Sequence, residues 1–419
     1  MSEKKLPFSY EEIKRITEEY STPFHIYDEK GILEHAASLN SAFSRFQGFR
    51  EFFAVKACPN PFIMKVLKSQ GFGVDCSSLT ELMLAQECGF SGEDIMFSSN
   101  DTPEDEFLKA RELGAVINLD DITHIETLEN SAGLPDLISF RYNPGSLKKG
   151  NEIIGKPEEA KYGLTHEQII EAYGICKAKG VKRFGVHTMV ASNELNPEYF
   201  VETADILFSL IKELNQRHGI SIEFANIGGG IGIPYKPEEK GVDYNTVAQG
   251  IGDRYKKHFR EGDPVKLFME CGRVITGPYG YLVSRVRHIK NTYKRFAGLD
   301  ACMADLMRPG MYGAYHHITV PGKDELPITE VYDITGSLCE NIDKFAVDRR
   351  LPELEKGDII VIHDTGAHGY AMGFNYNGKL RSKELLLRSD RSVMEIRREE
   401  RPEDYFATID RSRLQGFGG

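Results

Sequence analysis

Short apolar runs alternate with amphipathic stretches between about residue 50 and residue 275. The runs are rich in β-branched and aromatic residues and end in turn residues, which is typical of buried strands. They cover residues 51–57, 73–78, 94–99, 115–121, 137–143, 183–189, 224–230 and 266–272. Between them, stretches such as 79–89 and 198–219 repeat apolar residues with the helical period. Eight strand–helix units of this length predict a (β/α)8 barrel of the TIM type, whereas a doubly wound sheet usually has about five or six strands.

After Gly277 the pattern changes. Residues 279–291, 328–339 and 358–367 alternate as strands do, with turns between them and little helix. Residues 21–28 also form a candidate strand ahead of the barrel. The prediction is therefore an α/β protein in which residues 30–277 form the barrel. Residues 1–29 and 278–419 are predicted to form a β-rich domain of the sandwich or barrel kind.

Composition narrows the class of protein. A chain of 419 residues suits two domains, and its 41% hydrophobic and 27% charged residues are those of a soluble globular protein. The net charge of −11 argues against a nucleic-acid partner, which requires a basic face. No segment approaches the ~20 apolar residues of a membrane span, and the N-terminus lacks the apolar core of a signal peptide. The seven cysteines are scattered with no CxxC pair, which predicts reduced thiols, no metal site and a cytoplasmic protein.

Polar side chains end several of the predicted strands, and barrel enzymes keep their active sites at this end. Lys56 ends the first strand, where burial would favour the nucleophilic, uncharged amine. Alternatively, Lys56 extends to water as an ordinary strand-end lysine. Asp75 and Ser77 end the second strand, and each could instead cap the helix that begins at Leu79.

A glycine triplet and a charged pair follow the last two predicted strands. Gly228, Gly229 and Gly230 come after the seventh strand, where backbone N–H groups of a barrel commonly bind phosphate. A triplet of glycines alone is often only a tight turn. Glu270 and Arg273 end the eighth strand, beside that loop. A carboxylate at this place suits the ring nitrogen of pyridoxal phosphate, because it keeps that nitrogen protonated.

Six ordered motifs resemble those of a known family. They are FAVKACP around Lys56, Asp75-Cys76-Ser77-Ser78-Leu79-Thr80-Glu81, NIGGGIG at 226–232, Glu270-Cys271-Gly272-Arg273, RPGMYGAYH at 308–316, and GSLCE at 336–340 with NIDKFAVDR after it. The family is that of the barrel-type, alanine-racemase-like pyridoxal-phosphate decarboxylases, and among them the diaminopimelate decarboxylases. The resemblance extends from about Thr22 to Met394.

The resemblance implies a role for each motif residue. Lys56 would bind pyridoxal 5'-phosphate covalently, Ser192 and the glycine triplet would hold its phosphate, and Glu270 would face the ring nitrogen. Asp75 would belong to the same cofactor site. Arg273, Arg308 and Tyr312 would bind the distal carboxylate of the substrate, and Glu340 its distal ammonium. Cys339 would return a proton to the α carbon after CO2 leaves. The alternatives are a structural ion pair for Arg308 and a buried apolar role for Cys339.

Three positions depart from the family pattern. Where the family has H-x-H-x-G-S, this chain has His187-Thr188-Met189-Val190-Ala191-Ser192, so the ring-stacking histidine is replaced by Met189, unless His187 reaches the ring. The G-A-Y motif is Gly366-Ala367-His368, so by register His368 replaces a tyrosine that contacts phosphate and substrate. Tyr370, two residues later, is the alternative. Cys271 stands where the E-P-G-R motif has proline.

The resemblance implies decarboxylation of meso-2,6-diaminopimelate to L-lysine and CO2, the final step of lysine biosynthesis. It also implies a homodimer with shared active sites, each using Cys339 and Glu340 of the neighbouring subunit. The close alternative is a related decarboxylase acting on D-lysine, D-ornithine, arginine or carboxynorspermidine, but paired arginines favour a substrate with a second carboxylate. A racemase is disfavoured because Cys339-Glu340 matches the decarboxylases. A non-catalytic regulator on this fold is disfavoured as well, because it would need neither Lys56 nor Cys339 and this chain has both.

Overall fold

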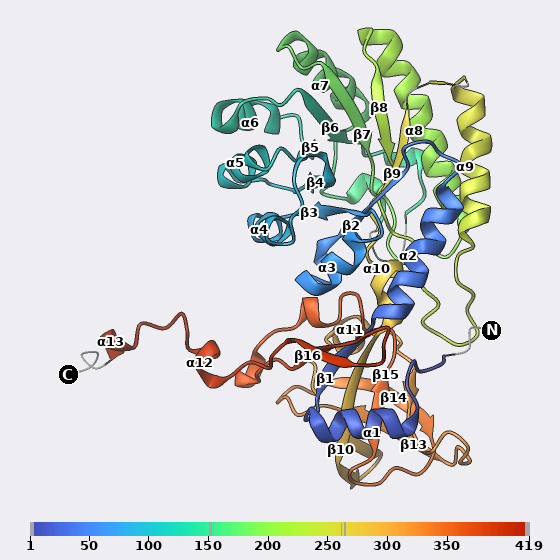
Figure 1. The fold of residues 1–419 in the computed structure, drawn as a ribbon, viewed down its shortest axis with the longest axis vertical. Coiled ribbons are helices and arrows are strands. Elements are labelled where there is room, and N and C mark those ends of the chain that lie inside the picture. Colours follow the sequence, from blue (N-terminus) through green and yellow to red (C-terminus); the bar gives the residue numbers. More distant parts are fainter. Residues whose placement is uncertain (1–3, 151–152, 154, 261, 264, 415–419) are drawn as a thin grey trace. The chain divides into compact units, whose positions relative to one another are not determined.

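A computed structural model describes residues 4–414 except 151–152, 154, 261 and 264. Eight parallel strands close into a barrel in sequence order (Figure 1), which confirms the predicted fold. They are β2 (Arg50–Ala54), β3 (Gly73–Cys76), β4 (Ile95–Ser98), β5 (Val116–Leu119), β6 (Leu137–Arg141), β7 (Arg183–His187), β8 (Ile222–Asn226) and β9 (Lys266–Met269). Most of them end two or three residues earlier than predicted, because the chain turns as soon as it leaves the barrel wall.

Helices alternate with the barrel strands along the chain, and α2 to α9 lie on the outside of the barrel (Figure 1). They are α2 (Glu29–Phe43), α3 (Pro61–Lys68), α4 (Leu79–Glu87), α5 (Glu104–Glu112), α6 (His124–Ala132), α7 (His166–Ala178), α8 (Pro197–His218), α9 (Tyr244–His258) and the short α10 (Arg273–Thr276). Local sequence sets their ends. Thr165 and Gln168 form a capping box at α7, and Gly219 ends α8 in the left-handed conformation with φ 58°.

The inward-facing side chains of the barrel form an apolar layer below a polar one. The lower layer packs Phe52, Met96, Val116, Leu137 and Phe224 with Phe268. Gly185 makes room for this layer, because a Cβ atom there would lie 2.0 Å from the Phe224 ring. Two residues further along the strands, the side chains that face inward are polar and buried: Asp75, Asn118, Ser139, His187 and Asn226. Alternation along each strand thus places the polar layer at the C-terminal end of the barrel.

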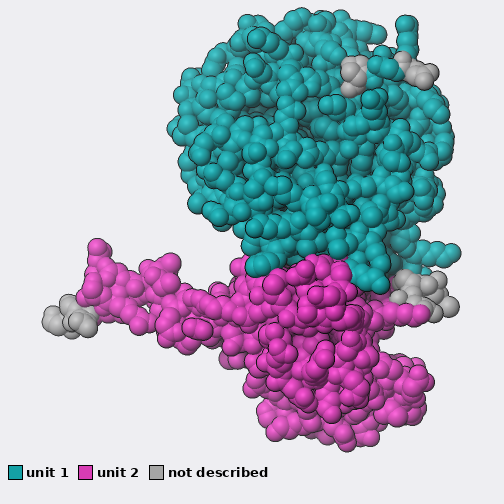
Figure 2. All heavy atoms as spheres, in the orientation of Figure 1, with its two compact units in different colours: residues 1–2, 30–234, 238–277 teal, residues 3–29, 235–237, 278–419 magenta. Residues whose placement is uncertain are grey.

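Residues 30–234 and 238–277 form the first of two compact units (Figure 2). The second contains residues 235–237, the chain from Pro278 onward, and the N-terminal segment up to Glu29. The sequence of residues 146–163, rich in glycine and lysine, predicts a long loop; residues 151–152 and 154 of this segment lie outside the described residues. No helix among the described residues is long and apolar enough to cross a membrane.

The second unit is built on a mixed sheet, which confirms the prediction of a β-rich domain. Its strands within the described chain are β1 (Phe24–Asp28), β10 (Gly280–Asn291), β11 (Arg295–Leu299), β12 (Ile318–Thr319), β13 (Glu330–Thr335), β14 (Lys344–Leu351), β15 (Ile359–Ile362), β16 (Lys383–Leu387) and β17 (Val393–Arg397). The N-terminal β1 pairs with β10 and β16, which ties the two ends of the chain together.

Helices are few in the second unit. They are α1 (Tyr10–Glu19), α11 (Arg308–Tyr312), α12 (Pro402–Tyr405) and α13 (Arg411–Leu414) in its described part. We did not predict α1, although Ser9 and Glu12 form a capping box at its start. Its buried residues Ile13 and Ile16 pack in one apolar cluster with Phe24 of β1 and Val361 of β15.

Candidate active site in the barrel

Lys56 lies in a 3-10 turn, Val55–Ala57, that follows β2. Its side chain is exposed, so the prediction that burial would desolvate this amine is wrong for the structure described here. The reason is local, because the chain leaves the barrel wall at Ala54 and turns before it reaches the lysine. The Lys56 charge still acts on three carboxylates, those of Asp75, Glu81 and Glu270, and favours the charged form of each, although burial raises the pKa of Asp75 and of Glu81 overall.

Glu270, directly after β9, is buried between two polar side chains. Its Oε2 lies 2.9 Å from Nε2 of His187, and its Oε1 accepts a hydrogen bond from Nδ2 of Asn226 (2.6 Å). Burial opposes ionisation of Glu270, but the neighbouring His187, Lys56 and Asn226 outweigh it and hold the pKa of Glu270 below its usual value. The site therefore keeps a buried carboxylate in its charged form.

Asp75 faces the same interior from β3. Burial and the charge of Glu270 raise the pKa of Asp75 well above its usual range, against the influence of Lys56. Its Oδ1 atom has no hydrogen-bond partner among the described residues. Asp75 does not cap α4, and neither does Ser77. Ser78 caps this helix, with its side chain accepting from the N–H of Glu81, whose carboxylate in turn accepts from Ser77.

The glycine triplet after β8 is wedged against two backbone segments. A Cβ atom at Gly228 would lie 2.4 Å from the carbonyl oxygen of Thr188, and one at Gly229 would lie 2.1 Å from that of Glu270. Gly228 and Gly230 also have positive φ angles, 68° and 94°. Only glycine fits this close approach, and the N–H of Gly228 donates to Oδ1 of Asn226 (2.9 Å). A glycine loop after the seventh strand of a barrel is a common place for phosphate.

Met189 contacts this loop through its sulfur. The N–H of Gly229 lies 3.2 Å from Sδ of Met189 and donates to it. His187, the other candidate for stacking on a cofactor ring, is buried with its Nε2 atom at Glu270. The predicted phosphate ligand Ser192 lies close by, with its Oγ accepting from Nη2 of Arg273 (3.4 Å). The structure thus brings Ser192 and Arg273 together.

Arg141 is a site residue that we did not predict. It ends β6, and its Nη1 atom lies 3.3 Å from Oδ1 of Asp120 and 3.4 Å from Oδ1 of Asn100. Its Nη2 atom donates to the carbonyl oxygen of Met189 (3.4 Å). The sequence feature that could have identified Arg141 is the one used for Lys56, a cationic residue at the C-terminal end of a predicted strand. Arg141 places a fixed positive charge next to the segment that carries Met189.

The other predicted site residues lie in the second unit. Arg308 begins α11 and is buried, whereas Tyr312 at the end of this helix is 64% exposed. The Nη1 atom of Arg308 donates to the hydroxyl of Tyr235 (2.6 Å) and lies 3.2 Å from Nε2 of His316. Nδ1 of His316 lies 2.8 Å from the carbonyl oxygen of His363. Because that carbonyl only accepts, Nδ1 carries the proton and Nε2 accepts from Arg308.

Cys339 and Glu340 occupy an exposed loop between β13 and β14. The carboxylate of Asp343 holds this loop, because its two oxygens accept from the N–H of Leu338 (2.8 Å) and the N–H of Met303 (2.7 Å). All seven cysteines lie in the described part of the chain; six are buried and Cys339 is exposed. A buried apolar role for Cys339 is therefore wrong.

His368 and its alternative Tyr370 also differ in their surroundings. His368 has a positive φ of 56°, an uncommon conformation for a residue other than glycine. The Tyr370 ring is buried between two cations, with the guanidinium carbon of Arg381 at 3.7 Å and that of Arg397 at 5.0 Å from its centre. Tyr370 is thus part of the packing of the second unit, which favours His368 as the site residue.

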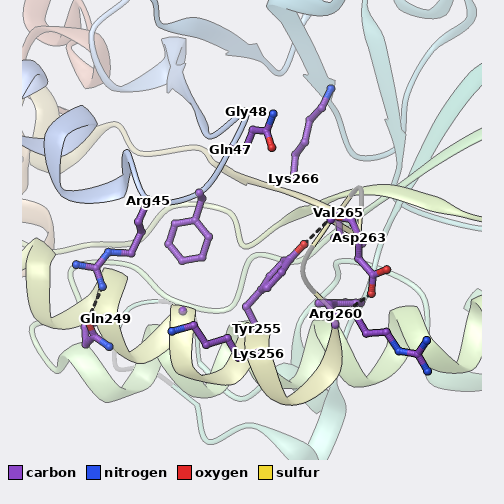
Figure 3. A pocket seen from close by; sticks show the side chains of 14 residues that line it. Arg45, Gln47, Gly48, Gln249, Tyr255, Lys256, Arg260, Asp263, Val265 and Lys266 are labelled. Atoms are coloured by element: carbon purple, nitrogen blue, oxygen red, sulfur yellow. Dashed lines mark hydrogen bonds between the residues drawn. The ribbon is translucent and has the colours of Figure 1, made fainter.

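A pocket of about 980 Å³ lies elsewhere on the barrel unit (Figure 3). Gly48 and Lys266 both line this pocket. Gly48 comes just before β2 and Lys266 begins β9, so the pocket is at the N-terminal end of the strands. Its lining includes Arg45, Tyr255 and Lys256 and none of the predicted site residues. Since active sites of barrels lie at the opposite end, we place the candidate site at Lys56 and Glu270.

Comparison with known proteins identifies the family to which the barrel belongs. Residues 30–277 match the family model described as pyridoxal-dependent decarboxylase, pyridoxal binding domain. Protein TabA of Pseudomonas amygdali pv. tabaci is 43% identical over 95% of this chain and 93% of its own. The diaminopimelate decarboxylase of Methanothermobacter thermautotrophicus is 36% identical over 89% of this chain and 88% of its own.

Solved structures extend the comparison to the fold. Diaminopimelate decarboxylase from Helicobacter pylori, complexed with L-lysine, superimposes with a TM-score of 0.87 and 30% identity, covering 96% of this chain and all of that one. Lysine/ornithine decarboxylase from Vibrio vulnificus shares the fold, with a TM-score of 0.77 at 19% identity. Together with the match over the whole barrel, these findings show that the chain belongs to the pyridoxal-dependent decarboxylases, whose cofactor is pyridoxal phosphate.

Proposed function

We propose that this protein decarboxylates meso-2,6-diaminopimelate to L-lysine and CO2, the final step of lysine biosynthesis. The observation that carries the proposal is that the similarity to diaminopimelate decarboxylases covers both units of the chain. The family model accounts for residues 30–277 alone, whereas the Archaeoglobus fulgidus enzyme of that name is 33% identical over 96% of the chain. The second unit contains Arg308, Cys339 and Glu340, the residues predicted to recognise and protonate this substrate.

The barrel residues fit pyridoxal phosphate. Lys56 offers an exposed amine for the covalent bond. The hydroxyl of Ser192 offers a donor to the phosphate, and Ser192 follows Ala191, whose carbonyl oxygen lies against Gly230 of the glycine loop. Glu270 offers a buried, charged carboxylate for the ring nitrogen, and its oxygens retain acceptor sites beyond those that His187 and Asn226 use. When bound, pyridoxal phosphate supplies an electron sink for the negative charge that remains on the α carbon after CO2 leaves.

The residues of the chain would do the rest of the chemistry. Glu270 keeps its charge through His187 and so favours a protonated ring nitrogen. Arg308 and Arg273 would bind the distal carboxylate, and Glu340 the distal ammonium, which together fix the orientation of the bond to be broken. The thiol of Cys339 would donate its proton to the α carbon from Sγ. Its exposure leaves it accessible to a substrate.

We infer that the protein is a homodimer with shared sites, in which Cys339 and Glu340 of one subunit serve the barrel of the other. What supports this is that Lys56 and Cys339 lie in different compact units and that Cys339 sits on an exposed loop beside the exposed, apolar Ile342. A symmetric pair would then make two equivalent sites. Free thiols at all seven cysteines, each in the described chain, suit the reducing cytoplasm.

The experiment that tests the proposed substrate is product analysis with cofactor-loaded protein. We expect L-lysine and CO2 from meso-diaminopimelate, and turnover of D-lysine slower by about a thousandfold, because D-lysine leaves buried guanidinium groups without their anion. Arg308→Gln should reduce kcat/KM for meso-diaminopimelate, while Arg350→Gln, an exposed control on β14, should not. Equal turnover of D-lysine, D-ornithine, arginine or carboxynorspermidine would replace the proposed substrate with that compound.

A further inference from the structure

One buried carboxyl group of the barrel has no role in the site described above. Glu51, on β2, is 1% exposed and pairs in register with Met269 of β9. Its Oε1 atom accepts a hydrogen bond from the N–H of Cys271 (2.5 Å), and its Oε2 atom has no partner among the described residues. Burial raises the pKa of Glu51 well above its usual range and so favours the uncharged form of this group. An uncharged carboxyl fits an interior position next to a backbone N–H.

Cys271 is the point at which the elements of the site meet. Its carbonyl oxygen accepts from the N–H of Ala54, the last residue of β2 before the Lys56 turn (3.2 Å). Directly before it, the N–H of Glu270 donates to the carbonyl oxygen of Gly228 (2.9 Å). Directly after it, Gly272 is so close to the Lys56 turn that a Cβ atom would lie 2.6 Å from Cβ of Ala57. A shift of Cys271 would therefore move Glu270, the glycine loop and the Lys56 turn relative to one another.

The N–H of Cys271 needs an acceptor because the residue is buried. A buried N–H without a partner costs about 1–3 kcal/mol. The E-P-G-R motif that this segment resembles has proline at this position, and proline has no N–H. Replacing that proline with cysteine creates a donor, and Glu51 supplies the acceptor. The thiol of Cys271 also contacts Glu51, which together with burial raises the pKa of this thiol well above its usual value.

We propose that Glu51 is a positioning residue of the cofactor site, which holds the Glu270–Gly272 turn through the N–H of Cys271, and that Glu51 and Cys271 function as a matched pair. The proposal concerns the cofactor site alone and does not depend on which amino acid is decarboxylated. It predicts that the two residues are coupled: removal of the acceptor or the donor alone disturbs the site, and removal of both restores it.

The test uses the full-length protein and five variants. Glu51→Val removes the acceptor, Cys271→Pro removes the N–H, and Glu51→Val with Cys271→Pro removes both. Glu51→Gln retains an uncharged acceptor of the same shape, and Cys271→Ala retains the N–H without the thiol. The readouts are the dissociation constant of pyridoxal phosphate, titrated by absorbance into cofactor-free protein, the visible spectrum of the loaded protein as a function of pH, and the melting temperature.

We expect Glu51→Val and Cys271→Pro each to weaken cofactor binding by about tenfold or more and to change the pH dependence of the spectrum. Glu51→Gln, Cys271→Ala and the double variant should stay within about threefold of the parent protein and keep its spectrum. A lower melting temperature with unchanged affinity and spectrum would make Glu51 merely structural and overturn the proposal. The proposal would also be overturned if the double variant bound pyridoxal phosphate no more tightly than Cys271→Pro does. This comparison can be made even if Glu51→Val alone does not fold.

Discussion

The Nε2 atom of His187 lies 2.9 Å from Oε2 of Glu270, although the two residues are 83 positions apart in the sequence. Both side chains are buried, and burial alone would raise the pKa of Glu270. His187 reverses that tendency and lowers the pKa of Glu270, with help from Lys56 and Asn226. The charge of Glu270, which we propose for the ring nitrogen of the cofactor, thus depends on a histidine from another strand.

Removal of His187 should therefore change the pH profile of the enzyme. In His187→Leu the burial of Glu270 is no longer opposed by the imidazole, so the pKa of Glu270 rises. The charged carboxylate then forms only at higher pH, and the acid limb of the profile of kcat/KM against pH moves to higher pH. Glutamine at this position retains an N–H donor for Glu270, so His187→Gln should shift the limb less. An acid limb that is the same in His187→Leu and the parent protein would contradict this role of His187.

Borohydride reduction of the loaded protein should fix the pyridoxyl group to Lys56. The reason is that this exposed amine acts electrostatically on Asp75 and Glu270, at the same end of the barrel strands as the glycine loop. Peptide mapping by mass spectrometry identifies the labelled lysine. Lys56→Ala should lose the label, the yellow colour and activity, the last by about a thousandfold or more. Lys65→Ala, an exposed control on α3, should keep all three. A label on any other lysine would refute the assignment.

A methyl group at Gly229 should disrupt the phosphate loop. The Cβ atom of Gly229→Ala would lie 2.1 Å from the carbonyl oxygen of Glu270, which is backbone and cannot move aside cheaply. We expect cofactor affinity to fall by about tenfold or more and stability by about 1–3 kcal/mol. Gly252→Ala, within α9, is the matched control. Its Cβ atom would lie 3.8 Å from the side chains of Arg45 and Phe46, which is ordinary van der Waals contact. This control should keep its affinity and gain up to about 1 kcal/mol of stability. Equal effects of the two substitutions on affinity would rule out the loop as the phosphate site.

The proposed shared site of a dimer predicts complementation between inactive variants. Lys56→Ala would lack the proposed covalent attachment point and Cys339→Ala the proposed proton donor, so each should be nearly inactive alone. If subunits exchange at random, about half of the dimers are mixed, and each mixed dimer has one site with both lesions and one with neither. About a quarter of the parent activity should return. Native mass spectrometry of the mixture verifies the exchange.

The outcome of that mixing experiment separates two arrangements. If exchange is demonstrated and the mixture stays as inactive as its parents, Lys56 and Cys339 act in a site of the same chain. The pair Lys56→Ala and Arg308→Gln would then show whether other residues of the second unit cross to the partner.

The sequence by itself determined the barrel and the place of its site. Alternation with a period of two fixes which side chains of a strand face inward. The polar side chains of Asp75, His187 and Asn226 therefore form one layer, above the apolar layer that contains Phe52 and Phe224. Parallel strands bring their C-terminal ends together, which makes Lys56 and Glu270 neighbours of that layer. The β-rich second unit also followed from local pattern, although its first helix, α1, was missed.

Only the tertiary structure decided which of these groups bind one another. The pairing of Glu270 with His187 and Asn226, the contact of Met189 with Gly229, and the bond from Cys271 to Glu51 all join strands or loops that are distant in sequence. Such contacts depend on the offset between strands in the closed barrel and on side-chain rotamers. The exposure of Lys56 was decided in the same way, by the point at which the chain leaves the barrel wall. A pattern of apolar and polar residues specifies the face on which a side chain lies, but not the partner that it meets there, because that partner is brought in by another part of the fold.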